Sequence, residues 1–241
     1  MGSDSLDAWC ATYAPSLRNP PPPGPGVCDT CRGPAPASSR ECSSCRRMPR
    51  RLDAVVPISW SLAGGPLHHA LRGYKDDPLL MVRREFASGL AAVLDRFLRR
   101  HEPCVAAAAS VGRFSLVTTV PARADRDRGP LRSLVRGCPS VAGRFARSLA
   151  PAGEPPPAHG FAPGRFRALH PLAGETVLLI DDTWTSGASA QSAAHALKRG
   201  GAHRVALVVI GRHINPGFGD QRPRCAPAPP FDWAACAAHR R

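Results

Sequence analysis

Two adjacent carboxylates, followed by a run of hydroxyl side chains, form the stretch of this 241-residue chain most suited to chemistry. Residues 176–189 read TVLLIDDTWTSGAS. Four of the first five are apolar, which is typical of a strand buried on both faces of a parallel sheet, and Asp181 and Asp182 follow where that strand should end. Neighbouring like charges repel each other, so the pair favours a ligand with hydroxyl donors, or a metal ion, close by.

The residues after the acids have the composition of a phosphate-binding loop. Gly187 allows the backbone to approach a ligand closely, and residues 190–199 are typical of a helix. The first N–H groups of such a helix have no intrahelical partner and carry partial positive charge, so they can bind an anion. Further donors come from Thr183, Thr185, Ser186, Gly187, Ala188 and Ser189. A phosphate cradle beside a diol-binding acid pair fits a phosphorylated ribose, and an ordinary strand end with a capping aspartate is the alternative.

Four cysteines have the spacing of a metal site. Cys28-x-x-Cys31 and Cys42-x-x-Cys45 lie in a Gly-, Pro-, Ser- and Arg-rich segment with almost no apolar content. Two such pairs can close tetrahedrally on one zinc ion, and the metal would supply the stability that so small a module lacks. Two disulfides are the alternative, which a reducing compartment disfavours. Four thiolates leave no open position, so we expect a structural zinc.

The motif at 177–189 resembles the phosphoribosyl pyrophosphate (PRPP) signature of type I phosphoribosyltransferases, which is an apolar strand, two acids, two variable residues and a hydroxyl-rich loop. With the cysteine pairs and Tyr74-Lys75, the chain is similar to the ComF family of competence-associated phosphoribosyltransferases, especially its actinobacterial members. The resemblance covers roughly residues 28–215. It implies an α/β fold of the type I phosphoribosyltransferase kind: a twisted, mostly parallel sheet with flanking helices, preceded by a small four-cysteine zinc module.

The resemblance also implies roles for individual residues. Asp181 and Asp182 would hold the ribose hydroxyls and the loop 183–189 the 5′-phosphate, with Mg²⁺ on the diphosphate. The expected catalytic residues are Asp181, Asp182 and Arg128.

Three cations outside the motif are also expected to contact PRPP. Lys75 is one of two lysines in the chain, and a phosphate-binding role competes with that of a solvated surface lysine. Arg123 and Arg128 lie in an arginine-rich stretch where the family has a pyrophosphate loop and lid, and arginine forks suit a diphosphate. The sequence departs from the family's Arg-Gly-Phe-Asn here, because Pro130 and Leu131 follow Gly129.

We therefore expect an enzyme, a glycosyltransferase that moves phosphoribose between PRPP and a nitrogenous base with release of pyrophosphate. The acceptor base cannot be identified, since acceptor specificity lies in variable segments. One alternative is a non-catalytic PRPP- or nucleotide-sensing adaptor in DNA uptake or recombination that contacts single-stranded DNA or a helicase. Another is a transcription regulator built on the same pocket.

Hydrophobic patterns predict the elements that must position these residues. Strands are expected at 55–60, 115–120, 176–180 and 205–210, with an edge strand at 165–169. Helices are expected at 6–13, within 64–76 with Gly73 as a cap, at 78–100, at 141–149 and at 190–199. We expect residues 1–50 to form an N-terminal segment with the zinc module and 51–241 the phosphoribosyltransferase-like domain, with 231–233 folding back onto it.

The net charge of +14 invites a nucleic-acid role, yet only two of the 32 basic residues are lysine, which is typical of a GC-rich genome. Aromatic residues make up only 6%, and none interleaves with the arginines of 123–136, so a base-stacking surface is not indicated. An apolar run of about 18 residues and a signal-peptide pattern are both missing, so we expect a cytoplasmic protein without a membrane span. The other cysteines have no paired spacing and are most simply buried or free thiols: Cys10, Cys104, Cys138, Cys225 and Cys236.

Overall fold

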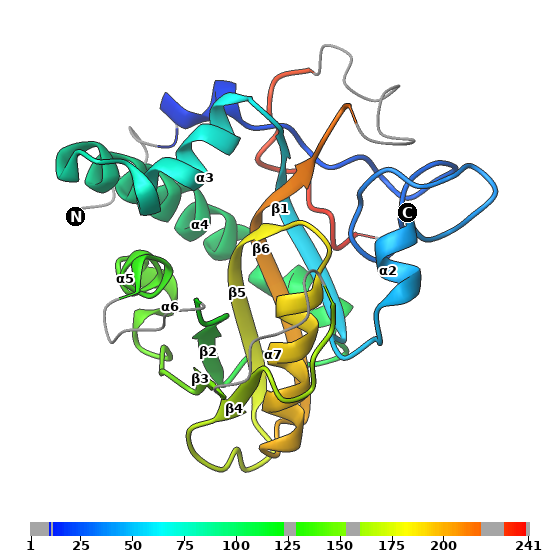
Figure 1. Cartoon of the computed structure of the whole chain (residues 1–241), viewed down its shortest axis with the longest axis vertical. Helices are drawn as coiled ribbons and strands as arrows, with labels where there is room; N and C mark the ends of the chain where they lie inside the picture. Colours follow the sequence, from blue (N-terminus) through cyan, green and yellow to red (C-terminus); the bar gives the residue numbers. More distant parts are fainter. Residues whose placement is uncertain (1–9, 11, 123–128, 153–159, 218–228, 240–241) are drawn as a thin grey trace.

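The computed structural model describes residues 10, 12–122, 129–152, 160–217 and 229–239. A four-stranded sheet forms its centre (Figure 1). Its strands, in spatial order, are β1 (Ala54–Leu62), β6 (Arg204–Ile214), β5 (Thr176–Trp184) and β2 (Leu116–Thr119). All three neighbouring pairs are parallel. The predicted α/β class with a mostly parallel sheet is therefore confirmed.

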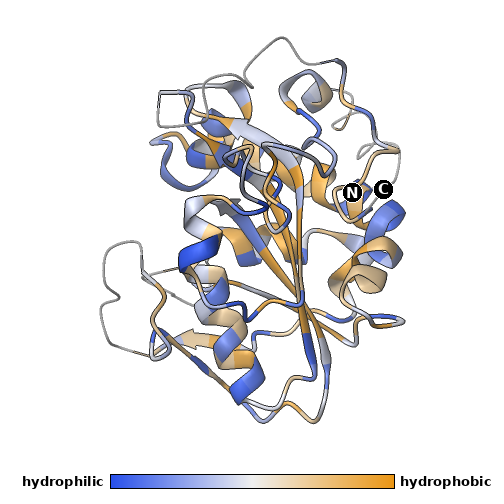
Figure 2. Ribbon diagram, turned by 90° about the vertical axis from the view of Figure 1, so that its right-hand side faces the viewer, coloured by the Kyte–Doolittle hydropathy of each residue, from blue (hydrophilic) through white to orange (hydrophobic). Residues whose placement is uncertain are grey.

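The central strands β5 and β6 are buried on both faces, as their continuous apolar runs predict. Because side chains alternate across a strand, Leu178 and Ile180 face one hydrophobic cluster while Val177 and Leu179 face the other. Figure 2 shows the strands coloured as hydrophobic over most of their length. The sheet is thus the middle layer of three.

Helices cover both faces of the sheet. One face packs against α3 (Pro66–Asp76), α4 (Leu80–Ala108), α5 (Pro130–Arg136) and α6 (Pro139–Ala142), and the other against α7 (Ala188–Arg199). The helix α4 continues past the predicted end at residue 100 and through Pro103, because Val105 and Ala106 beyond it are buried in the core. The expected cap at Gly73 is wrong. This glycine lies inside α3, where a Cβ atom would stand 2.5 Å from the ring of Phe86 on α4.

The expected helix at 141–149 is also wrong. The helix α6 ends at Ala142, and Leu149 begins β3 (Leu149–Pro151), which pairs antiparallel with β4 (Phe166–Ala168). Between α6 and β3 the chain runs beside β2, where the Val117 N–H donates to the Arg144 carbonyl and the Ala146 N–H donates to the Val117 carbonyl, each at 2.9 Å. These bonds give hydrogen-bond partners to backbone groups at the open edge of β2. The local helical pattern of residues 141–149 carries no information about this long-range contact.

Both ends of the described chain pack on the same body. The short helices η1 (Ala14–Ser16) and α2 (Ser43–Arg47) precede the sheet, and Phe231 and Trp233 pack against the main core, as expected for 231–233. The expected helix at 6–13 falls mostly outside the described residues. Among the helices that are described, none is both long and apolar enough to cross a bilayer.

Candidate functional site

A cavity of about 370 Å³ opens at the carboxyl ends of β2 and β5. This is the edge at which open α/β sheets bind ligands, and the volume suits a small molecule. The cavity is lined by Lys75, Asp181, Asp182, Thr183 and Ser189, which the sequence singled out. The remaining loop residues Thr185, Ser186, Gly187 and Ala188 complete the connection to α7 without being among the lining residues.

The acid pair lies within β5, because the strand does not end at residue 180 as expected. Asp181 is opposite Val209 of β6. Asp182 is buried, and its Oδ2 accepts a hydrogen bond from the Tyr74 hydroxyl and an ion pair from the Lys75 ammonium. Tyr74 and Lys75 are neighbours in the last turn of α3, so one helix end fixes this carboxylate.

Burial raises the pKa of Asp181 to about 8, with the charge of Asp182 as the next cause, while Lys75 and Arg165 lower it. Burial also raises the pKa of Tyr74, again followed by the Asp182 charge, so this hydroxyl stays protonated and donates. Asp181 therefore holds a proton near neutral pH, and a bound cation would favour release of that proton. The pair offers the cavity one fixed carboxylate and one adjustable carboxyl group.

The loop after the acids needs glycine at one position. Gly187 is the N-cap of α7 and has a φ of 85°, which L side chains rarely adopt, and a Cβ atom there would stand 2.3 Å from the Trp184 ring. Trp184 is buried beneath the loop, and the Ala188 N–H donates to the Ser186 Oγ at 3.4 Å. The loop thus connects the acid pair of β5 directly to the N-terminus of α7.

Two arginines that are not part of the motif at 177–189 also line the cavity. Arg132 comes from α5 and is buried, and Arg165 comes from the residue before β4. Arg132 belongs to the arginine-rich stretch that the sequence predicted as an anion-binding lid, whereas Arg165 carried no signal besides its charge. The predicted Arg123 and Arg128 lie outside the described residues. Pro130 stands at the first position of α5, so this departure from the family pattern marks a helix start.

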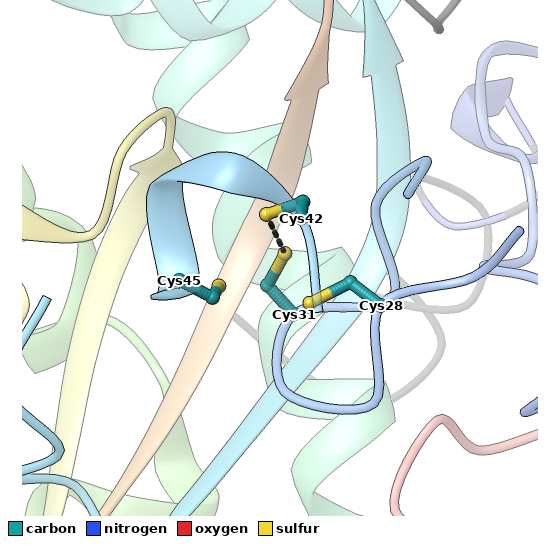
Figure 3. Close-up of side chains that lie close together, drawn as sticks. All are labelled: Cys28, Cys31, Cys42 and Cys45. Atoms are coloured by element: carbon teal, nitrogen blue, oxygen red, sulfur yellow. Dashed lines mark hydrogen bonds between the residues drawn. The ribbon is translucent and has the colours of Figure 1, made fainter. Parts of the chain in front are cut away.

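The four predicted cysteines form a buried cluster (Figure 3). Their sulfur atoms all lie within 4.8 Å of one another, and the Cys31 and Cys42 sulfurs are 3.9 Å apart. A tetrahedron with Zn–S bonds of about 2.3 Å has edges of about 3.8 Å. Cys42 caps α2 and Cys45 lies within it, which brings the second pair onto the first. The cluster could hold a structural zinc ion.

The cysteine cluster packs directly on the sheet. Arg212 of β6 is buried, and its Nε donates to the Cys31 Sγ at 3.3 Å while its Nη1 donates to the Trp184 carbonyl at 3.3 Å. A Cβ atom on Gly33 would stand 2.5 Å from this guanidinium. The pKa of Cys31 is lowered to about 7, first by hydrogen bonding with Cys28, and the Arg212 charge acts in the same direction.

Comparison with known proteins leaves the function to be argued from this geometry. No family model matches the chain, and no curated protein matches it. The boundary near residue 50 stays a prediction.

Proposed function

We propose that the cavity binds PRPP with Mg²⁺ and that the protein is a type I phosphoribosyltransferase similar to the ComF family. One observation carries the proposal: the acid pair and Ser189, in the first turn of α7, line a single cavity, and the loop between them leads into the N-terminus of that helix. Ribose hydroxyls donate to carboxylates, and a phosphate accepts from helix N–H groups. A ligand that carries vicinal hydroxyls and a phosphate group on one small sugar matches this arrangement.

Asp182 has a fixed position in the proposed complex. The Tyr74 hydroxyl and the Lys75 ammonium hold its carboxylate before any ligand arrives, so the site is preorganised for the ribose hydroxyls. Asp181 would accept a second hydroxyl after losing its proton. Mg²⁺, whose preferred ligands are oxygens, would neutralise charge on the diphosphate, and Asp181 offers it a carboxylate oxygen.

The cations of the cavity suit the pyrophosphate. Lys75, Arg132 and Arg165 line the cavity, and their positive charges are opposite in sign to the charge of a diphosphate. In the transfer, the bond from C1 of the ribose to a pyrophosphate oxygen breaks and a bond from C1 to a base nitrogen forms. Positive charge builds up on the ribose ring and negative charge on pyrophosphate, and preorganised groups of opposite sign stabilise both. A side-chain nucleophile is not needed.

Thermal unfolding with millimolar PRPP and MgCl2 tests binding. A ligand that binds only the folded state raises the melting temperature by mass action. We expect a rise for the wild type and for Asp76→Asn, since Asp76 is exposed and lies outside the cavity lining, and loss of most of it for Asp181→Asn and Asp182→Asn. Equal melting curves with and without PRPP would refute the proposal.

A pyrophosphate-release screen over purine and pyrimidine bases then separates an enzyme from an adaptor. We expect one base to release pyrophosphate from PRPP in the presence of the protein. Binding of PRPP without release by any base would instead favour the sensing adaptor.

A further inference from the structure

A second group of metal-ligand side chains lies apart from both the cavity lining and the four-cysteine cluster. His101 and Cys104 belong to α4, and Cys236 belongs to the C-terminal segment 229–239. One ligand atom from each lies within 4.8 Å of those of the other two. His101 and Cys104 are three residues apart, so they share one face of the helix.

His239 approaches this group at Cys104, without belonging to the set whose ligand atoms all lie within 4.8 Å of one another. Its Nε2 lies 3.2 Å from the Cys104 Sγ. His101-x-x-Cys104 on the helix therefore meets Cys236-x-x-His239 on the returning chain, two short pairs that each supply one imidazole and one thiol. His239 is exposed whereas His101 is buried, which leaves the group open to solvent at one corner.

The orientation of His101 is fixed in the manner of a ligand. Its Nε2 lies 2.8 Å from the Trp233 carbonyl oxygen, which can only accept, so Nε2 carries the hydrogen. In the neutral ring Nδ1 then has a free electron pair, and this atom lies 3.9 Å from the Cys104 Sγ. Metal-bound histidines typically donate their other N–H to a carbonyl or carboxylate in this way.

The two S···N distances that involve Cys104 are compatible with a tetrahedral site. Bonds of about 2.3 Å to sulfur and 2.0 Å to nitrogen give S···N edges of about 3.5 Å, between the two values of 3.2 and 3.9 Å. Two thiolates and two imidazoles are a frequent structural zinc set, and soft ligands of this kind disfavour Mg²⁺ and Ca²⁺.

We propose that His101, Cys104, Cys236 and His239 bind a second zinc ion, which fastens the C-terminal segment to α4. The same segment contacts the loop of the first cluster, because the Arg32 Nε donates to the Ala237 carbonyl at 3.1 Å. The second metal therefore secures a segment that lies across both α4 and the loop of the four-cysteine cluster. This site does not depend on PRPP binding.

Metal analysis of the full-length protein, purified without chelator, tests the proposal. We expect two zinc ions per chain in the wild type, one in the Cys104→Ser/Cys236→Ser double variant, and two in the control Cys138→Ser, whose cysteine is buried outside both clusters. A wild type with no more zinc than the double variant would overturn the proposal. A Cys104–Cys236 disulfide found by mass spectrometry of the freshly purified, unreduced protein would overturn it as well.

The variant His239→Asn tests the second site even if the double variant does not fold. His239 is exposed, so its replacement leaves the core intact. We expect the zinc affinity of the second site to fall at least about tenfold, since loss of even an outer-shell partner costs that much. In the cobalt-loaded protein, the absorption bands of a two-sulfur, two-nitrogen site should change while those of the four-sulfur site stay. Unchanged affinity and bands would refute the four-residue site.

Discussion

Replacement of Asp181 by asparagine isolates the electrostatics of the acid pair. Burial and the Asp182 charge raise the pKa of Asp181 to about 8 in the folded protein. In the unfolded chain the carboxyl group titrates near its ordinary value of about 3.9. Between these two values the folded state binds a proton that the unfolded state has lost. The free energy of unfolding therefore falls as pH rises from about 4 to 8, and the Asp181 contribution is fully present only below that window.

The magnitude follows from the width of the window. Each pKa unit corresponds to about 1.4 kcal/mol, so a shift of about four units sets an upper limit of about 5–6 kcal/mol at pH 8.5. Asp181 is only partly buried, and solvent screens its charge. We expect a difference of about 1–3 kcal/mol, within the range measured for unfavourable buried polar groups. The neutral asparagine escapes this loss, so the variant should be the more stable protein at pH 8.5.

Urea unfolding of both proteins at pH 5, 6, 7 and 8.5 measures the effect. The two unfolding free energies should agree at pH 5 within about 1 kcal/mol, a typical scatter for a conservative substitution, and diverge steadily as the pH rises from 5 to 8. Histidines titrate in the same range but are present in both proteins, so they cancel in the difference. Asp76→Asn should follow the wild type at every pH. A constant difference across the range, or a wild type that gains on the variant as pH rises, would refute the reasoning.

Three other substitutions test the remaining parts of the sites. Tyr74→Phe removes one donor to the buried Asp182 and should lower the unfolding free energy by about 1–3 kcal/mol while weakening the PRPP-induced shift; an unaffected shift would show that Asp182 does not need this hydroxyl. Gly187→Ala places a Cβ atom against Trp184 at positive φ and should cost about 1–3 kcal/mol in urea unfolding, whereas Gly143→Ala, at a site with open space, should cost less. Cys31→Ser should lose one zinc ion and destabilise the chain by about 3–5 kcal/mol, because Arg212 loses the charged partner of a buried pair; retention of all the zinc would contradict the assignment of the four-cysteine cluster as a zinc site.

Local patterns in the sequence predicted the parts of the fold that depend on neighbouring residues. The apolar runs at 176–180 and 205–210 became the buried strands β5 and β6. The short Cys-x-x-Cys spacing brings the two sulfur atoms of each pair close together, and the start of α2 positions the second pair. In these cases the information lies within a few residues of the element.

Long-range contacts set the parts that the sequence did not predict. The segment 144–146 pairs with the edge of β2, although its own pattern favours a helix. Arg165 reaches the cavity only through the β3–β4 hairpin. The pairs at 101–104 and 236–239 carry matching signals, but each alone is weak, and 132 residues separate His101 from Trp233, whose carbonyl orients it.

The buried Arg212 explains why the four-cysteine cluster lies against this sheet. A guanidinium that loses its water shell needs acceptors and an opposite charge close by. Cys31 supplies the charge, and the Trp184 carbonyl supplies an acceptor on the neighbouring strand, where Trp184 and Arg212 are paired in register. Trp184 in turn packs under Gly187, the N-cap of α7. A divalent metal with four thiolates carries net negative charge, so metal loading strengthens the counter-charge that keeps Arg212 buried. The cysteine module thus stabilises the ends of β5 and β6 and the loop from which the proposed PRPP site is built.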